Sequence, residues 1–223
     1  MAGIIITPVG HPNGAEVQMP KPGYLEAVRE LANQYHCLLI FDEIRSGFRC
    51  SLGGAQKLFG VTPDLSTFGK AMANGYAIAA LVGKEEYMQV MTDKVFLSST
   101  FFPNSDGIVA AIKTIEILER DHILDVIAEK GRKFGAEVEK VVEESDVPVN
   151  FTGAPWMPYI TFKKDEIGRY KQLRTEYYTQ LIRRKVFMQP YHHGYICYRH
   201  TDEDLAYTVE AIRESIAEVK KML

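Results

Sequence analysis

The sequence has few cysteines, no long apolar run and almost no net charge. Its three cysteines (Cys37, Cys50 and Cys197) form no C-x-x-C pair, so neither a zinc ribbon nor a disulfide framework is indicated. No apolar run is long enough to span a bilayer, and no basic stretch precedes the first apolar residues as in a signal peptide. The 26 basic and 29 acidic side chains give a net charge of −3, which offers no electrostatic case for nucleic acid or an anionic membrane. We therefore expect a protein of the reducing cytoplasm, without a nucleic-acid or membrane partner.

The composition indicates a folded chain with enough apolar material for a core. Hydrophobic residues make up 46% and charged residues 25%, which is the balance of a globular domain. At about 150 residues per domain, the 223 residues correspond to one large domain or two small ones. The first half alternates short apolar runs with helical patterns, whereas the second half has the mixed pattern of an α+β domain. We therefore predict two domains, residues 1–125 and residues 126–223.

Apolar patterning predicts the strands and helices. The run at 37–41 is continuously apolar, as in a strand buried on both faces of a parallel sheet. Other apolar runs predict strands at 4–6, 65–68 and 78–82, and near residues 149, 159, 187 and 196. Apolar side chains spaced by three and four residues predict helices at about 25–32, 53–59, 106–118, 123–143 and 168–185. Thr201, followed by three acids, predicts the start of a last helix. A core strand so near the beginning has no earlier element to cover it, so we expect the later part of a larger domain.

Three short segments carry side chains suited to chemistry. Asp42, with Glu43, directly follows the strand predicted at 37–41, and the carboxyl ends of such strands line the ligand crevice of α/β sheets. Lys70 follows another predicted strand and a glycine, a context that favours an amine held near a crevice and available for Schiff-base chemistry. Ser99 and Thr100 precede a predicted helix, where hydroxyls and helix-end amides bind phosphate.

Each segment also has an ordinary structural interpretation, since acids after strands cap loops, most lysines are solvated, and Ser/Thr turns cap helices. Asp-Glu after an apolar run is also typical of a Walker B strand, but the sequence has no G-x-x-x-x-G-K-[ST] motif. In combination, Asp42, Lys70 and Thr100 follow one another at intervals of 28 and 30 residues (70 − 42 and 100 − 70), each near the end of an apolar segment. They supply the anion, the amine and the hydroxyl that pyridoxal 5′-phosphate (PLP) needs for its ring nitrogen, aldehyde and phosphate.

The sequence around these residues forms an ordered series of motifs. Segments 38–44, 46–49, 53–56 and 58–65 (LLIFDEI, SGFR, GGAQ and LFGVTPDL) lead to the lysine-bearing segment 68–76. This series, with Thr100, Asn104 and the residues HTDED at 200–204, resembles the class III aminotransferases of fold type I. The resemblance is greatest to the glutamate-1-semialdehyde 2,1-aminomutase branch. It covers essentially the whole chain but corresponds to the C-terminal portion of the family.

The resemblance implies a fold and a set of roles. The expected fold is α/β: the later part of a fold type I PLP domain, with a mainly parallel sheet and flanking helices, followed by a C-terminal α+β cap domain. Lys70 is expected to hold PLP as a Schiff base and to act as the catalytic base. Asp42 is expected to pair with the ring nitrogen, Ile44 to pack on a ring face, and Thr100 to bind phosphate across a homodimer interface. The implied activity is amino-group transfer on an amino acid or amine, by an aminotransferase or aminomutase.

The sequence also departs from the family. A phosphate cup and a stacking aromatic residue usually lie upstream of this portion, so a longer gene product or a second chain must supply them. Thr7 stands where many members have glutamate, and Ala77 and Ser105 stand where proline is usual. A PLP-dependent racemase or decarboxylase of the same fold stays possible, as does an inactive truncated chain that needs a partner. His192 and His193 would point to opposite faces of a strand, so we expect no metal site.

Overall fold

The computed structural model of the protein describes residues 2–10, 16–98, 100, 102 and 104–223, and the chain divides into two compact units. Unit 1 consists of Met1–Val9 and Pro20–Leu124, and unit 2 of Gly10–Met19 and Asp125–Leu223. The mixed α/β content, with a largely parallel sheet, agrees with the predicted fold class. The boundary at residue 125 between the domains of the complete protein stays a prediction.

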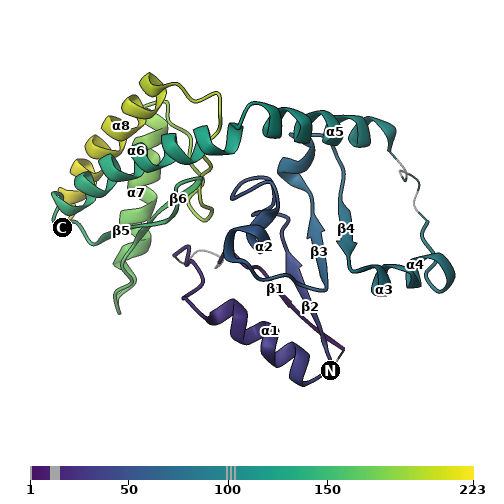
Figure 1. Cartoon of the computed structure of the whole chain (residues 1–223). Coiled ribbons are helices and arrows are strands. Elements are labelled where there is room, and N and C mark those ends of the chain that lie inside the picture. Colours follow the sequence, from purple (N-terminus) through teal and green to yellow (C-terminus); the bar gives the residue numbers. More distant parts are fainter. Residues whose placement is uncertain (1, 11–15, 99, 101, 103) are drawn as a thin grey trace. The chain divides into compact units, whose positions relative to one another are not determined.

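Unit 1 is built on a four-stranded sheet in the order β1 (Gly3–Ile6), β2 (Leu38–Asp42), β3 (Leu65–Phe68) and β4 (Ala80–Gly83) (Figure 1). The first three strands are parallel, and β4 runs antiparallel to β3. Because parallel strands end at the same edge of a sheet, the residues that follow β1, β2 and β3 lie along one edge. This carboxyl-terminal edge carries Asp42, Ile44 and Lys70, three of the residues that the sequence singles out.

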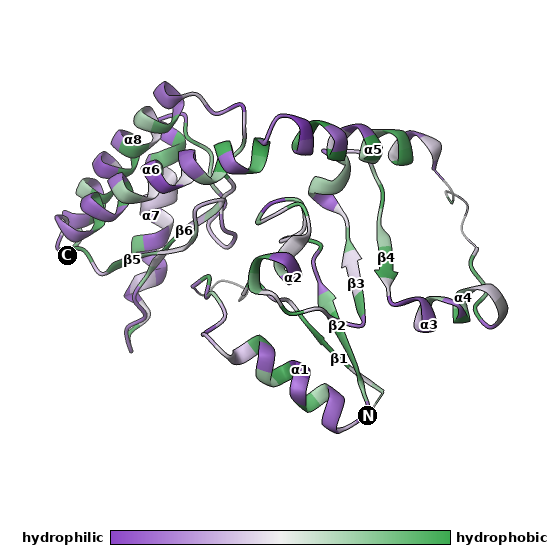
Figure 2. Cartoon of the chain, viewed as in Figure 1, coloured by the Kyte–Doolittle hydropathy of each residue, from purple (hydrophilic) through white to green (hydrophobic). Residues whose placement is uncertain are grey.

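The helices of unit 1 are α1 (Tyr24–Gln34), α2 (Gly54–Phe59), the 3-10 helix η1 (Lys70–Ala73), α3 (Glu85–Met88), α4 (Val90–Asp93) and α5 (Ser105–Arg120). Leu25 and Ala32 of α1 pack on Leu39 and Phe41 of β2, whose side chains are fully buried. A second cluster joins the end of β3, η1 and the buried side of α5. Figure 2 shows the polar and apolar sides of α1, and the apolar side carries the predicted helical spacing.

Asp64 connects the start of β3 to three neighbouring elements. Its carboxylate accepts hydrogen bonds from the Leu39 amide (2.8 Å), from Arg29 Nη1 (2.8 Å) on α1 and from Lys84 Nζ (2.6 Å) beside β4. Asp64 is only 3% exposed, and burial by itself raises the pKa of a carboxyl. The bonds from Lys84, Leu39 and Arg29 outweigh this effect and hold the pKa of Asp64 below its ordinary value. The ionised form of Asp64 therefore stabilises unit 1.

Unit 2 combines a two-stranded antiparallel sheet with three helices. Strands β5 (Val149–Ala154) and β6 (Met157–Phe162) pair along their whole length, and every residue of β6 is buried. The helices are α6 (Ile123–Glu143), whose first two residues belong to unit 1, α7 (Arg169–Arg183) and α8 (Asp202–Lys220). Thr201 and Asp204 form a capping box at the start of α8, as the sequence predicts. Among the described helices, none combines the length and apolar character that a membrane crossing requires.

Two predictions for unit 2 were wrong. The residues around Phe187 and Ile196 form no strand. The amide of Gly194 donates to the carbonyl of Pro158 in β6 (2.9 Å), and the amide of Ile196 donates to the carbonyl of Trp156, just before β6 (3.2 Å). These two bonds do not form a strand ladder. An apolar pattern cannot separate such a loop from a strand, because both bury apolar side chains.

The segment Gly10–Met19 groups with unit 2, although the sequence-based boundary assigns it to the first domain. The amide of Val17 donates to Thr152 Oγ1 (3.2 Å), and Asn150 Nδ2 donates to Glu16 Oε1 (2.6 Å). These bonds span more than 130 positions of the sequence, so local pattern could not have predicted them.

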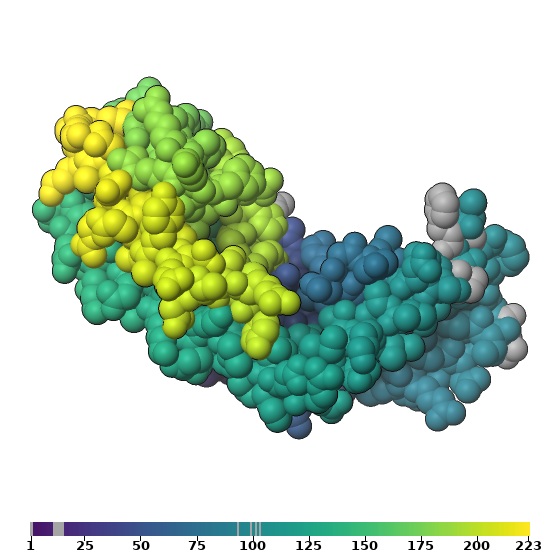
Figure 3. Space-filling view, turned by 90° about the horizontal axis from the view of Figure 1, so that it is seen from above, coloured from purple at the N-terminus to yellow at the C-terminus, as the bar shows by residue number. Residues whose placement is uncertain are grey.

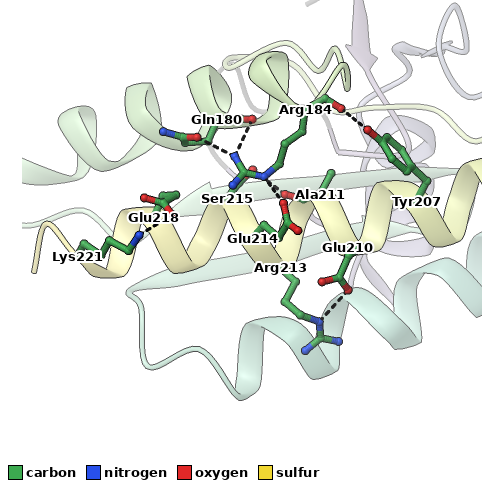
Figure 4. Close-up of polar contacts among 10 residues, drawn as sticks. All are labelled: Gln180, Arg184, Tyr207, Glu210, Ala211, Arg213, Glu214, Ser215, Glu218 and Lys221. Atoms are coloured by element: carbon green, nitrogen blue, oxygen red, sulfur yellow. Dashed lines mark hydrogen bonds and ion pairs between the residues drawn. The ribbon is translucent and has the colours of Figure 1, made fainter.

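Arg184, at the end of α7, joins this helix to α8 (Figure 4). Its Nη1 donates to Gln180 Oε1 (2.7 Å), and its Nε donates to Glu214 Oε2 (2.5 Å) on α8. The hydroxyl of Tyr207 on α8 donates to the Arg184 carbonyl (2.9 Å). The turn that ends α7 is therefore held against α8 by both its side chain and its backbone.

Candidate functional site

The carboxyl-terminal edge of the parallel sheet carries Asp42. This residue ends β2 and lies opposite Thr67 of β3. Its Oδ1 accepts hydrogen bonds from the Ile44 amide (3.1 Å) and from Thr67 Oγ1 (3.4 Å). Both bonds from described residues end on Oδ1, which leaves Oδ2 of this half-buried carboxylate available to a further donor.

Lys70 lies two residues beyond β3, at the same edge of the sheet. Its backbone φ is +44°, in the left-handed region, which costs a non-glycine residue roughly 1–2 kcal/mol. The side chain is exposed, and Nζ makes no hydrogen bond or ion pair with any described residue. Backbone strain of this kind clusters at functional positions, so it favours a chemical role for Lys70 over that of an ordinary surface charge.

Ile44 lies beside the residue that precedes Lys70. A Cβ atom on Gly69 would be 3.9 Å from Ile44 Cγ2 and 3.5 Å from the Ile78 carbonyl. The structure therefore brings Asp42, Ile44 and the Lys70 segment together at one edge of the sheet.

Thr100 is not joined to this group by any contact among the described residues. It is exposed, in the connection between α4 and α5, and its neighbour Ser99 lies outside the described residues. Asn104, from the same motif, caps α5 because its Oδ1 accepts from the Asp106 amide (3.2 Å). The phosphate-binding role of Thr100 therefore stays a prediction.

Sequence reasoning missed Thr67 at this edge, and it named Glu43 with Asp42 without predicting what Glu43 does. Thr67 supports Asp42 through its hydroxyl, but its importance follows only from the β2–β3 register. Glu43 follows Asp42 and is completely buried, where its carboxylate accepts three hydrogen bonds. Its place directly after a core strand marked it in the sequence, but the sequence could not show which groups would surround it.

The two adjacent histidines of unit 2 lie differently from the expectation. The rings of His192 and His193 are 4.3 Å apart, because the segment is not a strand and does not alternate its side chains. His193 is buried, and its Nε2 lies 2.8 Å from the Tyr195 hydroxyl. Within the part of the chain that the structure describes, no three His, Cys, Asp or Glu side chains group as metal ligands.

The groups at the edge of the sheet fit the reactive part of PLP. A pyridine nitrogen requires an anion to stay protonated, and Asp42 Oδ2 offers one. An aldehyde requires an amine, and Lys70 Nζ offers one without having to leave another partner among the described residues.

A family model described as Aminotransferase class-III matches residues 1–215, and the chain belongs to this family. It is 94% identical over all 223 residues to a 3-aminobutyryl-CoA aminotransferase from Cloacimonas acidaminovorans (strain Evry), of which it spans 54%. It is 32% identical over 227 residues to a glutamate-1-semialdehyde 2,1-aminomutase from Desulfovibrio desulfuricans. The matched region covers 96% of this chain and 52% of that protein. The chain thus spans about half the length of the curated relatives it matches. These findings confirm the predicted family and the likeness to the aminomutase branch.

Solved structures agree with this assignment. The PLP internal aldimine form of the FumI protein from Sphingopyxis sp. MTA144 has a TM-score of 0.90 at 25% identity, over 98% of this chain and 52% of that one. An omega-transaminase from Sphaerobacter thermophilus has a TM-score of 0.86 at 26% identity, over 97% of this chain and 52% of that one. The predicted fold class is confirmed.

Proposed function

We propose that the complete protein transfers amino groups with PLP as its cofactor, and that Asp42 and Lys70 hold the cofactor. One observation carries this proposal: Asp42 Oδ2 and Lys70 Nζ are both open to a ligand at the ends of adjacent parallel strands. Membership of the class III aminotransferases and the aminotransferase and aminomutase relatives support the same chemistry.

When bound, PLP supplies an aldehyde that captures amines and a ring that withdraws electrons from the bonds at the substrate Cα. Asp42 would keep the ring nitrogen protonated through Oδ2, while the bonds from Ile44 and Thr67 to Oδ1 fix the orientation of its carboxylate. Lys70 Nζ would hold the aldehyde and, when free of the cofactor, would accept the proton from the substrate Cα. Ile44 would lie against the ring.

The substrate class follows from the relative that is 94% identical over the whole chain. That protein is a 3-aminobutyryl-CoA aminotransferase, so we propose a 3-aminoacyl-CoA thioester as the substrate. The half of the relatives that this chain does not span completes the pocket in this proposal.

An intramolecular transfer is the second candidate, and the glutamate-1-semialdehyde aminomutases at 31–34% identity favour it. Racemases and decarboxylases of the same fold begin with the same labilised Cα bonds. A ¹⁵N-labelled amino donor separates these reactions. An aminotransferase moves the label to a second molecule, a mutase moves it within one molecule, and a racemase or decarboxylase leaves it in place.

We further propose that the protein acts as a homodimer, or with a second chain that supplies the missing half, and that Thr100 binds the cofactor phosphate across the interface. Thr100 is near exposed apolar side chains in the sequence, including Phe96 at 91% and Phe102 at 64% exposure. Helix α5 lies on the surface of the face shown in Figure 3, and its Val109 and Ile112 side chains are also exposed. Exposed apolar patches are typical of interaction surfaces, which supports this proposal.

A cytoplasmic location belongs to the same proposal. The three cysteines are free thiols, as is usual in a reducing compartment.

Borohydride reduction of the complete protein tests the role of Lys70. The complete protein is obtained by joining this chain to the part of the Cloacimonas aminotransferase that the chain does not span. Reduction in the presence of PLP should attach a pyridoxyl group to the peptide that contains Lys70, as read by mass spectrometry. The Lys70→Ala variant should lose this label, the visible absorbance of the cofactor and turnover of 3-aminobutyryl-CoA.

The exposed Lys94 provides a matched control, because Lys94→Ala removes an equivalent side chain away from the sheet edge. A Lys70→Ala protein with unchanged cofactor absorbance and full turnover would exclude the assignment. The 223-residue chain alone, titrated with PLP, should bind weakly or not at all, because it offers only part of the pocket.

A further inference from the structure

Glu43 carries a buried carboxylate next to the candidate site, and no step of the proposed chemistry uses it. It follows Asp42 in the chain and has no exposed surface. A carboxylate removed from water is strongly unfavourable unless hydrogen bonds replace its hydration. The surroundings of Glu43 therefore define what this residue does.

Three donors surround the Glu43 carboxylate. Its Oε2 accepts from Ser46 Oγ (2.6 Å) and from the Ala55 amide (2.9 Å), and its Oε1 accepts from the Gln56 amide (3.1 Å). The last two amides belong to the first turn of α2, where backbone N–H groups lack partners within the helix. Glu43 thus fixes the start of α2 from the end of β2.

Gly54 makes room for this contact. Its φ is +69°, and a Cβ atom there would lie 2.5 Å from Glu43 Oε1. Both the backbone conformation and the space require glycine. The spacing of Glu43, Ser46 and Gly54 in the sequence therefore has one physical explanation, the enclosure of a carboxylate.

The same residue is bonded to β3. The Glu43 amide donates to the Thr67 carbonyl (2.9 Å). Through α2, Gln56 Nε2 donates to Ser66 Oγ (3.3 Å). Glu43 therefore connects the end of β2 to the strand that leads to Lys70, by its own backbone and by the helix that it caps.

Asp42 and Ile44 flank this anchored residue. Asp42 presents its carboxylate toward Thr67, and Ile44 lies beside Gly69, whereas the Glu43 side chain turns to α2. A displacement of residue 43 would move both neighbours relative to Lys70.

We propose that Glu43 is a positioning residue, which sets the separation between the Asp42 carboxylate and the Lys70 amine by capping α2 and holding the end of β2 on β3. This inference rests on the proposed function, since the separation matters only if one cofactor joins both groups.

The test is Glu43→Gln in the complete protein with PLP. Glutamine keeps the size of the side chain but turns one acceptor into a donor, which opposes the N–H groups of α2. We expect PLP affinity and kcat each to fall about 10-fold or more, because small misplacements at a reacting centre reduce rates strongly. KM should stay within about 2-fold of the wild-type value, since the substrate-binding residues are unchanged. The pH midpoint of the cofactor's visible absorbance should shift, because it depends on the separation of the two groups.

A second pair of variants separates positioning from loss of stability. Gly54→Ala disturbs the same carboxylate from α2 and should reproduce the spectral shift. Gly60→Ala, at the other end of α2, imposes similar backbone strain at φ +70°. Its Cβ atom would have no described atom within 4 Å, so it should leave the absorbance midpoint unchanged. Asp64→Asn removes a buried carboxylate charge at the opposite end of β3 and should lower stability without the spectral shift. Glu43→Asp keeps the charge but is shorter, so it should give a smaller shift in the same direction.

Variants of Glu43 and Gly54 that lose stability but keep the wild-type absorbance midpoint, PLP affinity and kcat would overturn the inference and leave the proposed function intact. A wild-type complete protein that binds no PLP would overturn the proposed function, and the inference with it.

Discussion

Replacing Asp64 by asparagine tests whether a buried carboxylate at the amino-terminal edge of the sheet stabilises unit 1. The carboxylate accepts from the Leu39 amide, Arg29 Nη1 and Lys84 Nζ. Asparagine has one carbonyl oxygen and one amide donor in place of two acceptors. With its carbonyl oxygen in the place of Oδ2, which accepts from both Leu39 and Arg29, it can keep two of the three bonds. It loses the negative charge, and its amide N–H₂ replaces the acceptor of Lys84.

The magnitude depends mostly on Arg29. Its side chain is 17% exposed, so Asp64→Asn leaves a largely buried cation without its counter-charge. Lys84 is 47% exposed, so its ion pair contributes less than about 1 kcal/mol. With about 2 kcal/mol for the counter-charge that Arg29 loses and about 0.5 kcal/mol for the pair with Lys84, the free energy of unfolding of unit 1 should fall by about 2–3 kcal/mol.

Hydrogen exchange of the amides in β2 measures this loss. A decrease of about 2–3 kcal/mol should accelerate their exchange about 30- to 160-fold. Trp156 is the sole tryptophan and lies in unit 2, so its fluorescence in urea reports on the other unit and should not change. Lys84→Met removes only the exposed partner of Asp64 and should change the exchange by less than about 6-fold.

The pH dependence gives a second measurement on the same variant. The pKa of Asp64 is lowered in the folded state, so its contribution is complete above the unfolded value of about 3.9. This contribution is lost as the pH falls through the lower folded pKa. Below about pH 4, wild-type unit 1 should therefore lose stability more steeply than Asp64→Asn. Equal exchange rates of the β2 amides in the wild-type protein and in Asp64→Asn at pH 7 would refute the reasoning. So would a loss of stability in the Trp156 transition of unit 2 as large as the loss in unit 1.

Three further predictions concern unit 2 and the isolated chain. Gly131→Ala should destabilise unit 2 by about 1–3 kcal/mol, because its Cβ atom would lie 1.9 Å from the Pro155 carbonyl oxygen. Gly135→Ala meets only ordinary contacts and should stabilise α6 by up to about 1 kcal/mol. Trp156 fluorescence in urea measures both changes. Thr201→Ala should lower the free energy of unfolding of unit 2 by about 1 kcal/mol, because it removes the capping box of α8. Thr201→Ser should keep most of this stability. Equal stability of the two variants would contradict a capping role. The 223-residue chain alone should self-associate through its exposed apolar surface, including β1, and light scattering that shows a stable monomer would contradict this.

Local patterns predicted most of the elements because their signals are contained in neighbouring residues. The helix predicted at 123–143 matches α6, and the strands predicted at 4–6 and 65–68 match β1 and β3 within one residue. The strands expected near Phe187 and Ile196 failed because apolar side chains are buried in this loop without a continuous ladder. Periodicity reports which side chains avoid water, and it does not report which backbone groups pair.

The candidate site was predicted in part for a similar reason. Asp42 and Lys70 each follow an apolar strand, and the edge where parallel strands end could be inferred from this alone. Thr67 could not be inferred, because its bond to Asp42 depends on the register between two strands. The close approach of the His192 and His193 rings also depended on a loop conformation that sequence did not indicate.

The sequence by itself determined the family, the apolar strands, and the acid and the amine that follow them, because these are properties of contiguous residues. Only the tertiary structure decided that Asp42 faces Thr67 and that the Glu43 carboxylate closes on α2. It also decided that Lys70 has a strained backbone and an amine without a partner among the described residues. The physical reason is that each of these features depends on hydrogen bonds or backbone angles fixed by packing between segments far apart in the chain. Their energies exist only once the strands have paired.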